Sequence, residues 1–441
     1  MEASAQASFT SEGSISGRKR ATLRRWLLKL WVVPRKALSF IRHVAIQVTF
    51  LAFEYLLPTR DEDWCFCTWQ NYSHTLDNPR AVFEELKHDP SIRKIILQKE
   101  PGSPPVRDGC NVEFVSAESL RGAYHMARCR VMVIGYALRS VASYSKRVRA
   151  NRHLIIQLWH GVPVKRIGHL FPGETFWQRE TGRYDAVTSS SETDRKVMHQ
   201  AFRTIPLERV WVTGLPRYDF LLKDSRELPH DYRVHLRSLD ESLGGRKLVL
   251  YAPTWREDPD QLYFFSDEER ERLTYLLVEH GAVLGIRGHS NVRQHRGYTL
   301  HNPSDTILPL NHIPDVSVVL RRTEILVTDY SGIYIDFLLT DRPILHFAYD
   351  LEVYASGRGF VHDPHEAFAG PCVRTFDALV PHLENALSDP CLWRAERSKA
   401  RQLFHTHAGN SAHEVATRIR DLVNSDSRNR NGETRHTGIP R

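Results

Sequence analysis

The chain has 441 residues, of which 41% are hydrophobic and 25% are charged, the proportions of a soluble globular protein. These values exclude a largely disordered chain. One hydrophobic core rarely supports this length, so we expect two domains with accessory segments. The formal net charge of +8 indicates an anionic partner, and nucleic acid, a phosphorylated substrate and an anionic membrane surface all agree with it.

The six cysteines include no C-x-x-C pair and no cluster with histidines at zinc spacing, which favours a reduced cytosolic compartment. Cys65 and Cys67 lie two residues apart in an expected strand and share one face, so we interpret them as buried packing residues. The string from Asp258 to Asp260 has the D-x-D form used for metals. Acidic loops of this kind are frequent, so we predict no metal site.

Residues 1–60 are predicted to form a basic amphipathic segment that associates with membranes. From Arg18 to Lys36 the sequence carries eight Lys or Arg and no acid, interleaved with Trp26, Trp31 and aliphatic residues. This mixture favours a helix that lies in the lipid interface, because its aromatic rings can sit at the level of the headgroups while its cations contact anionic lipid. An ordinary solvated basic helix and a nucleic-acid arm are the alternatives.

The next apolar stretch, from Val44 to Leu57, contains Gln47 and Glu54 and is interpreted as too short to span a bilayer. We expect a second surface or packing helix here. A signal peptide is disfavoured because the apolar run lies behind a long polar stretch and no small-residue cleavage pattern follows it.

From Trp64 onward, short apolar runs such as "KIILQ", "VMVIG" and "LIIQLW" alternate with helical patterns. This alternation predicts a parallel sheet covered by helices over residues 61–225. A polar stretch that ends in Gly244 and Gly245 marks the junction, and a second series over residues 226–423 follows. We therefore predict an α/β protein with two Rossmann-like, doubly wound domains and a site at the strand ends that face the cleft. Residues 424–441 are expected to be disordered.

The first candidate site lies where the strand "LIIQLW" ends at Trp159 and a tight turn with Gly161 and Pro163 follows. His160 in this turn would present an imidazole that accepts a proton near neutral pH, and we favour this role over a core histidine bound to a carbonyl. Arg217 follows the next strand end and would grip phosphate oxygens in a bidentate manner. A surface pair with Asp219 is the alternative.

Strand ends of the second domain supply the other candidates. Thr254 would donate to a nucleotide through its hydroxyl or its amide. Arg287 and His289 flank Gly288 in extended backbone, so their side chains would converge on one anion. After the strand that ends at Thr328, free amides and the Ser331 hydroxyl at the start of a helix would cradle a pyrophosphate.

Asp336, five residues beyond Ser331, would meet a hydroxyl of the same ligand or face solvent. A plain serine N-cap is the alternative interpretation of Ser331.

Taken in order, the strings "LWHGVPVKRIG", "TGLPRYD", "YAPTWRED", "RGH" and "VTDYSGIYIDFLLTDRPILHFAYDLEVY" resemble the CDP-glycerol glycerophosphotransferase family, which builds teichoic acids and capsular polymers. The resemblance covers roughly Trp64 to His413. It implies a GT-B-like pair of domains, a CDP-glycerol or CDP-ribitol donor, transfer of the alditol phosphate to a hydroxyl, and release of CMP. The chain departs from the family pattern at Gly332 and Ser290, where the family has serine and proline.

Carried over by position, the family's donor contacts correspond to Trp159, His160, Gly161, Val162, Pro163, Arg217, Pro253, Thr254, Arg287, Gly288, His289, Ser331, Gly332 and Asp336. His160 corresponds to the family base, and His289 would meet the charge that develops on the departing CMP.

The resemblance also implies a lipid-linked or glycan acceptor and no bound cofactor, with the requirement for a divalent cation left open. We expect a peripheral protein at the cytoplasmic face of the cell membrane that contacts anionic lipid and no nucleic acid, and a homo-oligomer stays open. Two alternatives remain. One is a GT-B glycosyltransferase that uses a nucleotide sugar, and the other is a non-catalytic protein that binds membrane surfaces.

Overall fold

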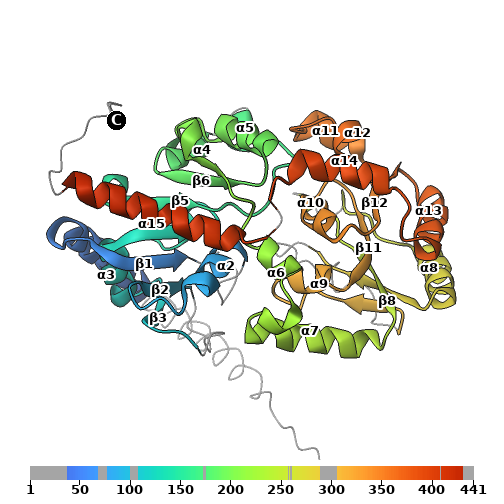
Figure 1. Ribbon diagram of the computed structural model, residues 1–441, viewed down its shortest axis with the longest axis horizontal. Coiled ribbons are helices and arrows are strands. Elements are labelled where there is room, and N and C mark those ends of the chain that lie inside the picture. The colour runs from blue at the N-terminus through green and yellow to red at the C-terminus, as the bar shows by residue number, and fades with distance from the viewer. Residues whose placement is uncertain are drawn as a thin grey trace, which may run out of the picture.

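The computed structural model describes residues 37–67, 77–99, 108–171, 175–256, 258, 261–288, 305–407 and 409–430. Within them, two parallel β-sheets flanked by helices form two lobes that lie side by side (Figure 1). The predicted α/β class with two parallel-sheet domains is confirmed. Every residue of the central strand Cys129–Ile134 is buried, as expected for a strand that helices cover on both faces.

The first lobe contains a seven-stranded sheet with the order β3-β2-β1-β4-β5-β6-β7. The strands are β1 (Arg60–Cys67), β2 (Arg93–Gln98), β3 (Val112–Ser116), β4 (Cys129–Ile134), β5 (Leu154–Gln157), β6 (Ala186–Ser189) and β7 (Val210–Val212). The helices are α2 (Asp77–Leu86), α3 (Leu120–Arg128), α4 (Thr175–Thr181) and α5 (Glu192–Ala201). The strand order reverses between β1 and β4, and ligands of open α/β sheets bind at the carboxyl ends of strands beside such a reversal.

The second lobe contains a six-stranded sheet with the order β10-β9-β8-β11-β12-β13. The strands are β8 (Lys247–Tyr251), β9 (Ala282–Ile286), β10 (Ile307–Pro309), β11 (Thr323–Thr328), β12 (Ile344–Phe347) and β13 (Cys372–Val373). The helices are α7 (His230–Leu243), α8 (Asp267–Glu279), α9 (Val316–Leu320), α10 (Ile333–Phe337), α11 (Leu351–Gly357), α12 (Pro364–Ala367), α13 (Phe376–Ser388) and α14 (Arg394–Phe404). Here the order reverses between β8 and β11. The short helix α6 (Tyr218–Leu222) lies between the two sheets in the sequence.

The helix α15 (Ser411–Arg430) follows the second sheet in the sequence but lies along the first lobe (Figure 1). Its apolar face, with Val415 and Ile419, joins the core around Trp64 and Phe66. The expectation of disorder from residue 424 onward is wrong for residues 424–430, which continue this helix. This polar end contacts the first lobe, because Asp426 pairs with the buried Arg130 at 2.5 Å and the Ser427 hydroxyl donates to Asp61 at 2.6 Å. Residues 431–441 lie outside the described part. The boundary near residue 225 stays a prediction.

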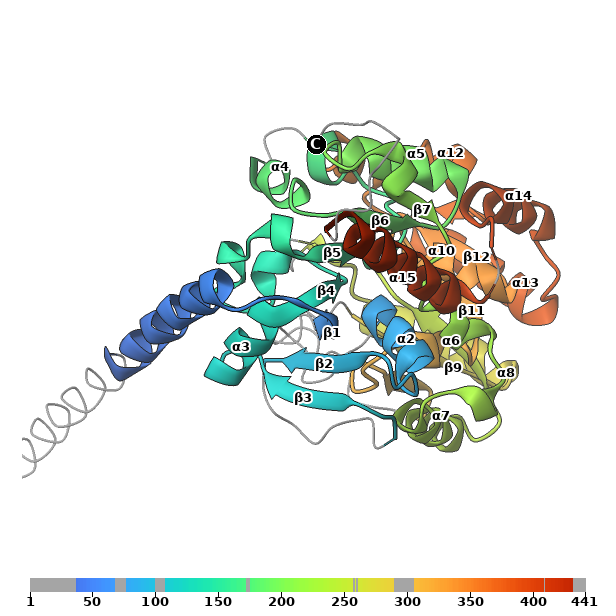
Figure 2. The same ribbon diagram turned by 60° about the vertical axis from the view of Figure 1, so that its left-hand side comes forward.

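The helix Ala37–Leu56 precedes β1 and points away from the first lobe (Figure 2). Its last turns are anchored: the Phe50 ring lies 4.7 Å from that of Tyr144, and the buried Glu54 is 2.9 Å from His153. The anchored half agrees with the expected packing helix. The expectation that the apolar stretch from Val44 to Leu57 is too short to span a bilayer is wrong. The helix that contains nearly all of this stretch has 20 residues and is long and apolar enough, by length and composition, to cross a membrane. The basic stretch from Arg18 to Lys36 lies outside the described residues.

The structure confirms the burial predicted for two of the cysteines, while the reduced compartment stays a prediction. Cys65 and Cys67 are buried in β1, and all six cysteines of the chain are free thiols. Among the residues that the structure describes, no group of three or more His, Cys, Asp or Glu is placed to hold a metal ion. Asp260, the second carboxylate of the D-x-D string, lies outside the described residues.

Candidate active site

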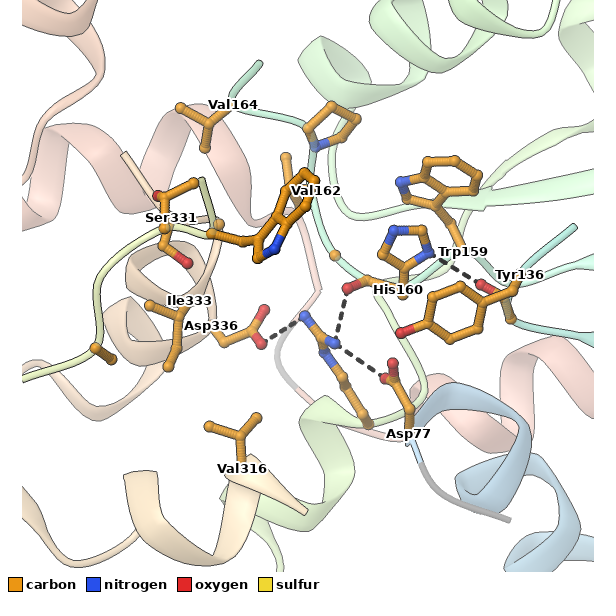
Figure 3. A pocket seen from close by; sticks show the side chains of 18 of the residues that line it. Asp77, Tyr136, Trp159, His160, Val162, Val164, Val316, Ser331, Ile333 and Asp336 are labelled. Atoms are coloured by element: carbon orange, nitrogen blue, oxygen red, sulfur yellow. Dashed lines mark hydrogen bonds and ion pairs between the residues drawn. The ribbon is translucent and has the colours of Figure 1, made fainter. Parts of the chain in front are cut away.

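A cavity of about 330 Å³ lies between the lobes, at the strand ends where both sheets reverse their order. Figure 3 shows side chains of both lobes around it. The predicted site residues that line it are Trp159, His160, Gly161, Val162, Pro163, Arg217, Pro253, Thr254, Arg287, Gly288, Ser331, Gly332 and Asp336. The structure thus brings together every predicted site residue that it describes, and His289 lies outside the described residues.

The turn after β5 that carries His160 is strained and firmly held. Trp159 has a φ of 54°, a left-handed value that is costly for a bulky residue. The Asn78 side-chain amide donates to the carbonyls of Leu158 and Trp159, at 3.2 and 2.9 Å. The Trp159 amide in turn donates to the Gln157 side chain at 2.8 Å. These bonds over-determine the turn and so maintain the unusual backbone conformation.

The His160 ring is oriented by its neighbours. Its Nδ1 lies 3.1 Å from the carbonyl oxygen of Gly135 (Figure 3). A carbonyl only accepts, so Nδ1 carries the proton and the lone pair of the neutral ring is on Nε2. The ring stacks on Tyr136 at 4.3 Å with 7° between the planes and contacts the Trp159 ring at 4.2 Å. His160 is half-buried rather than sealed in the core, so Nε2 is the atom suited to accept a proton at this cavity.

Arg217 has partners in both lobes. One terminal nitrogen lies 3.0 Å from Asp77 and 2.9 Å from the His160 carbonyl oxygen, and the other lies 2.6 Å from Asp336 (Figure 3). The alternative pair with Asp219 is wrong, because that carboxylate accepts the amides of Ser411 and Ala412 at the start of α15. Arg217 lines the cavity as predicted, and two carboxylates already contact its guanidinium, while its contact with a phosphate stays a prediction.

Asp336 is buried and does not face solvent, so that alternative is wrong. Burial raises the pKa of Asp336 to about 6, although the Arg217 charge opposes this shift. Burial also raises the pKa of Asp77, again against the attraction of Arg217. The Oδ1 atom of Asp336 has no hydrogen-bond partner within the described part of the chain. Two carboxylates therefore share one guanidinium in the cavity wall.

Thr254 ties two strand ends of the second lobe together. Both its amide and its hydroxyl donate to Asp329, at 2.8 and 2.5 Å. Asp329 is also 2.9 Å from Arg256, which reaches Asp350 at 3.0 Å. The predicted donation from Thr254 to a nucleotide is thus replaced by donation to Asp329. The network fixes the loop after β8 against the loop after β11.

The turn before α10 offers backbone amides to the cavity. The residue before this helix, Gly332, makes no side-chain cap bond, so the serine N-cap interpretation of Ser331 is wrong. Within the described residues, no acceptor binds the amides of Ser331, Gly332 or Ile333. A Cβ at Gly332 would lie 3.0 Å from the carbonyl oxygen of Val162, which explains why glycine suits this position.

Arg287 is held at the cavity wall by the loop after β10. Its guanidinium donates to the carbonyls of Leu310, Ile313 and Pro314 at 2.8, 2.7 and 3.0 Å. The Gly288 amide donates to Asn311 at 2.9 Å. These carbonyls orient the Arg287 guanidinium at the cavity wall.

The sequence interpretation missed Asp77, Asn78, Tyr136 and Asp329. Tyr136 follows the strand "VMVIG" directly, so the strand-end rule applied to His160 would have found it. The partners of Asp77 and Asp329 lie 140 and 75 residues away in the sequence, and no local signal identifies them.

Comparison with known proteins agrees with this geometry. Residues 49–421 match the family model described as CDP-glycerol:poly(glycerophosphate) glycerophosphotransferase. The chain is 25% identical over 369 residues to a teichoic acid poly(glycerol phosphate) polymerase of Bacillus spizizenii, covering 78% of this chain and 89% of that protein. It is 26% identical to a teichoic acid glycerol-phosphate transferase of Staphylococcus aureus, covering 70% and 80%. It spans only 44% of a Staphylococcus epidermidis polymerase to which it is 29% identical.

Among solved structures, the wall teichoic acid polymerase TagF has the same fold, with a TM-score of 0.71, 22% identity, and coverage of 94% of this chain and 100% of that one. A TagF variant soaked with CDPG gives a TM-score of 0.72. The match of the family model over most of the chain confirms the family resemblance. The chain belongs to the CDP-glycerol:poly(glycerophosphate) glycerophosphotransferase family and is a transferase of this type.

Proposed function

We propose that this protein transfers glycerol phosphate, or a related alditol phosphate, from a CDP-activated donor to a hydroxyl of a lipid- or glycan-linked acceptor. CMP is released, and the product contributes to teichoic acid biosynthesis. One observation carries the proposal: an oriented imidazole of the first lobe and open amides of the second lobe line the same cavity.

The reaction needs one general base and a set of hydrogen-bond donors that bind the departing phosphate. The acceptor hydroxyl gives its proton to Nε2 of His160 while its oxygen bonds to the phosphorus that carries the alditol. The bond from that phosphorus to the CMP oxygen breaks, with the two oxygens roughly in line. The amides of Ser331 to Ile333 and the Arg287 guanidinium stabilise the charge on CMP. No covalent enzyme intermediate is required, and the role of His289 stays a prediction.

The relatives leave the alditol open, because their names include both glycerol phosphate and ribitol phosphate polymerases. The deciding experiment incubates the purified chain with CDP-glycerol and CDP-ribitol separately and follows CMP release with and without a lipid-linked acceptor. We expect acceptor-dependent CMP release from one of the two. Release of a nucleoside diphosphate from a nucleotide sugar would support a glycosyltransferase, and absence of nucleotide turnover in every mixture would overturn the proposal.

We also place the protein at the cytoplasmic face of the cell membrane. The free half of the helix Ala37–Leu56 exposes Leu38, Phe40 and Ile41 at 65%, 68% and 61%. Exposed apolar side chains at this density favour contact with lipid. Sedimentation with anionic vesicles should recover the protein, and alkaline carbonate should release it if it is peripheral. Retention after carbonate would show that the helix spans the bilayer.

A further inference from the structure

The Arg217 side chain joins the two walls of the cavity. It follows β7 of the first lobe and precedes α6 in the sequence. Its guanidinium binds Asp77, at the start of α2 in the first lobe, and Asp336, in α10 of the second lobe. We call Asp77, Arg217 and Asp336 the interlobe clamp.

The interlobe clamp also holds the turn that carries the base. The guanidinium of Arg217 donates to the His160 carbonyl oxygen, and its backbone amide donates to the Asn78 side chain at 3.0 Å. The same Asn78 side chain donates to the carbonyls of Leu158 and of the strained Trp159, the two residues before His160. Arg217 therefore contacts this turn directly, at His160, and indirectly, through Asn78.

Burial makes the geometry of the clamp specific. Arg217 is 8% exposed and Asp336 is 2% exposed. A buried ion pair adds little net stability but tolerates little displacement, because a lost partner leaves an uncompensated charge. A Cβ at Gly161 would lie 3.0 Å from the Arg217 guanidinium, so the turn and the guanidinium fit closely. The planar fork of arginine can hold three acceptors in fixed directions, which an ammonium group cannot.

We propose that Arg217 is a positioning residue that fixes the His160 turn relative to the donor-binding turn at Ser331, by joining Asp77 and Asp336 across the cavity. This inference rests on the proposed function for its kinetic consequences. It assigns Arg217 no contact with the donor phosphates. Its loss should misplace the base while leaving the donor contacts intact.

The kinetic test compares Arg217→Ala with Arg130→Ala. Arg130 is a matched control, because it is also buried with two carboxylates, Asp61 at 3.8 Å and Asp426 at 2.5 Å, but joins β4 to β1 and α15 on the first lobe and does not line the cavity. We expect kcat of Arg217→Ala to fall about 100-fold, as for a misplacement of about 1 Å, with donor KM nearly unchanged. Added guanidinium ion should restore part of kcat in Arg217→Ala and none in Arg130→Ala. A raised donor KM with unchanged kcat would overturn the inference.

A second variant and a readout without turnover keep the inference testable if Arg217→Ala does not fold. Arg217→Lys retains the charge, and modification of His160 by diethyl pyrocarbonate can be followed by peptide mass spectrometry. We expect a changed rate at His160 and an unchanged rate at His413, which is exposed on α15. An unchanged rate of modification at His160 would contradict the inference. If the unaltered chain releases no CMP, the proposed function fails, whereas the His160 rate still decides the role of Arg217.

Discussion

The Nδ1 atom of His160 lies 3.1 Å from the carbonyl oxygen of Gly135, and this contact determines which ring nitrogen can act as a base. The bond fixes the proton on Nδ1 and directs chemistry to Nε2. The two residues follow β5 and β4, neighbouring strands of the first sheet, so the sheet itself sets the orientation of the imidazole.

His160→Ala should bind the CDP-alditol donor normally but transfer the alditol phosphate at least about 100-fold more slowly, as expected for loss of a general base. Calorimetry with the donor and an assay of CMP release measure the two effects separately. Turnover close to that of the unaltered protein would remove His160 from the role of base.

Arg287→Ala should raise the donor KM about tenfold or more, because a hydrogen bond to a charged group contributes about 1.5–3 kcal/mol. Arg246→Ala is the control, since this arginine also donates to backbone carbonyls, Leu243 at 2.8 Å among them, but does not line the cavity. Equal donor KM values for the two variants would rule out a phosphate contact by Arg287.

Gly332→Ala should weaken donor binding, because the new methyl group would lie 3.0 Å from the Val162 carbonyl oxygen and displace the turn. Gly357→Ala in α11 is the control, since its methyl group would have no neighbour within 4 Å and alanine favours a helix. Donor KM and thermal denaturation of both variants measure the effect. A Gly332→Ala protein with unaltered donor KM would show that this close approach does not shape the site.

The buried pair of His153 and Glu54 should make stability depend on pH. Burial lowers the pKa of His153, but hydrogen bonds to Cys129 and Glu54 outweigh it and raise the pKa to about 9. The folded pKa exceeds the unfolded value of about 6.5, so the stabilisation is fully present below about pH 6.5 and is lost as the pH rises through about 9. Burial raises the pKa of the neighbouring Cys129 thiol, but hydrogen bonds to Cys65 and His153 outweigh it and lower this pKa to about 7, so the thiol gains stabilisation over the same pH range. At about 1.4 kcal/mol per pKa unit the two contributions largely offset each other, and we expect a net loss of about 1 kcal/mol in the free energy of unfolding.

Urea denaturation between pH 6 and pH 9.5 measures this loss, and Glu54→Gln should reduce it. His413→Gln is the control, because His413 pairs with Glu85 at 2.8 Å on the surface, where ion pairs contribute little. The same slope in Glu54→Gln and the unaltered protein would contradict the assignment.

Local pattern predicted much of this molecule. Buried strands followed by small or polar residues identified the strand ends, and parallel topology brings such ends to one edge, which is why His160, Thr254 and Ser331 share a cavity. The partners of Arg217 and Thr254 escaped prediction, since Asp77 and Asp329 meet them only after the chain has folded. The position of α15 on the first lobe was not predicted either, because the apolar face of a helix does not indicate which sheet it will pack against.

The path of α15 has a consequence for synthesis on the ribosome. Residues 411–430 complete the apolar core around Trp64 and Phe66 of β1, which is made several hundred residues earlier. The first lobe therefore cannot bury that face until the second lobe has been translated, so the two lobes do not mature one after the other. A nascent chain at that stage would expose the face to chaperones.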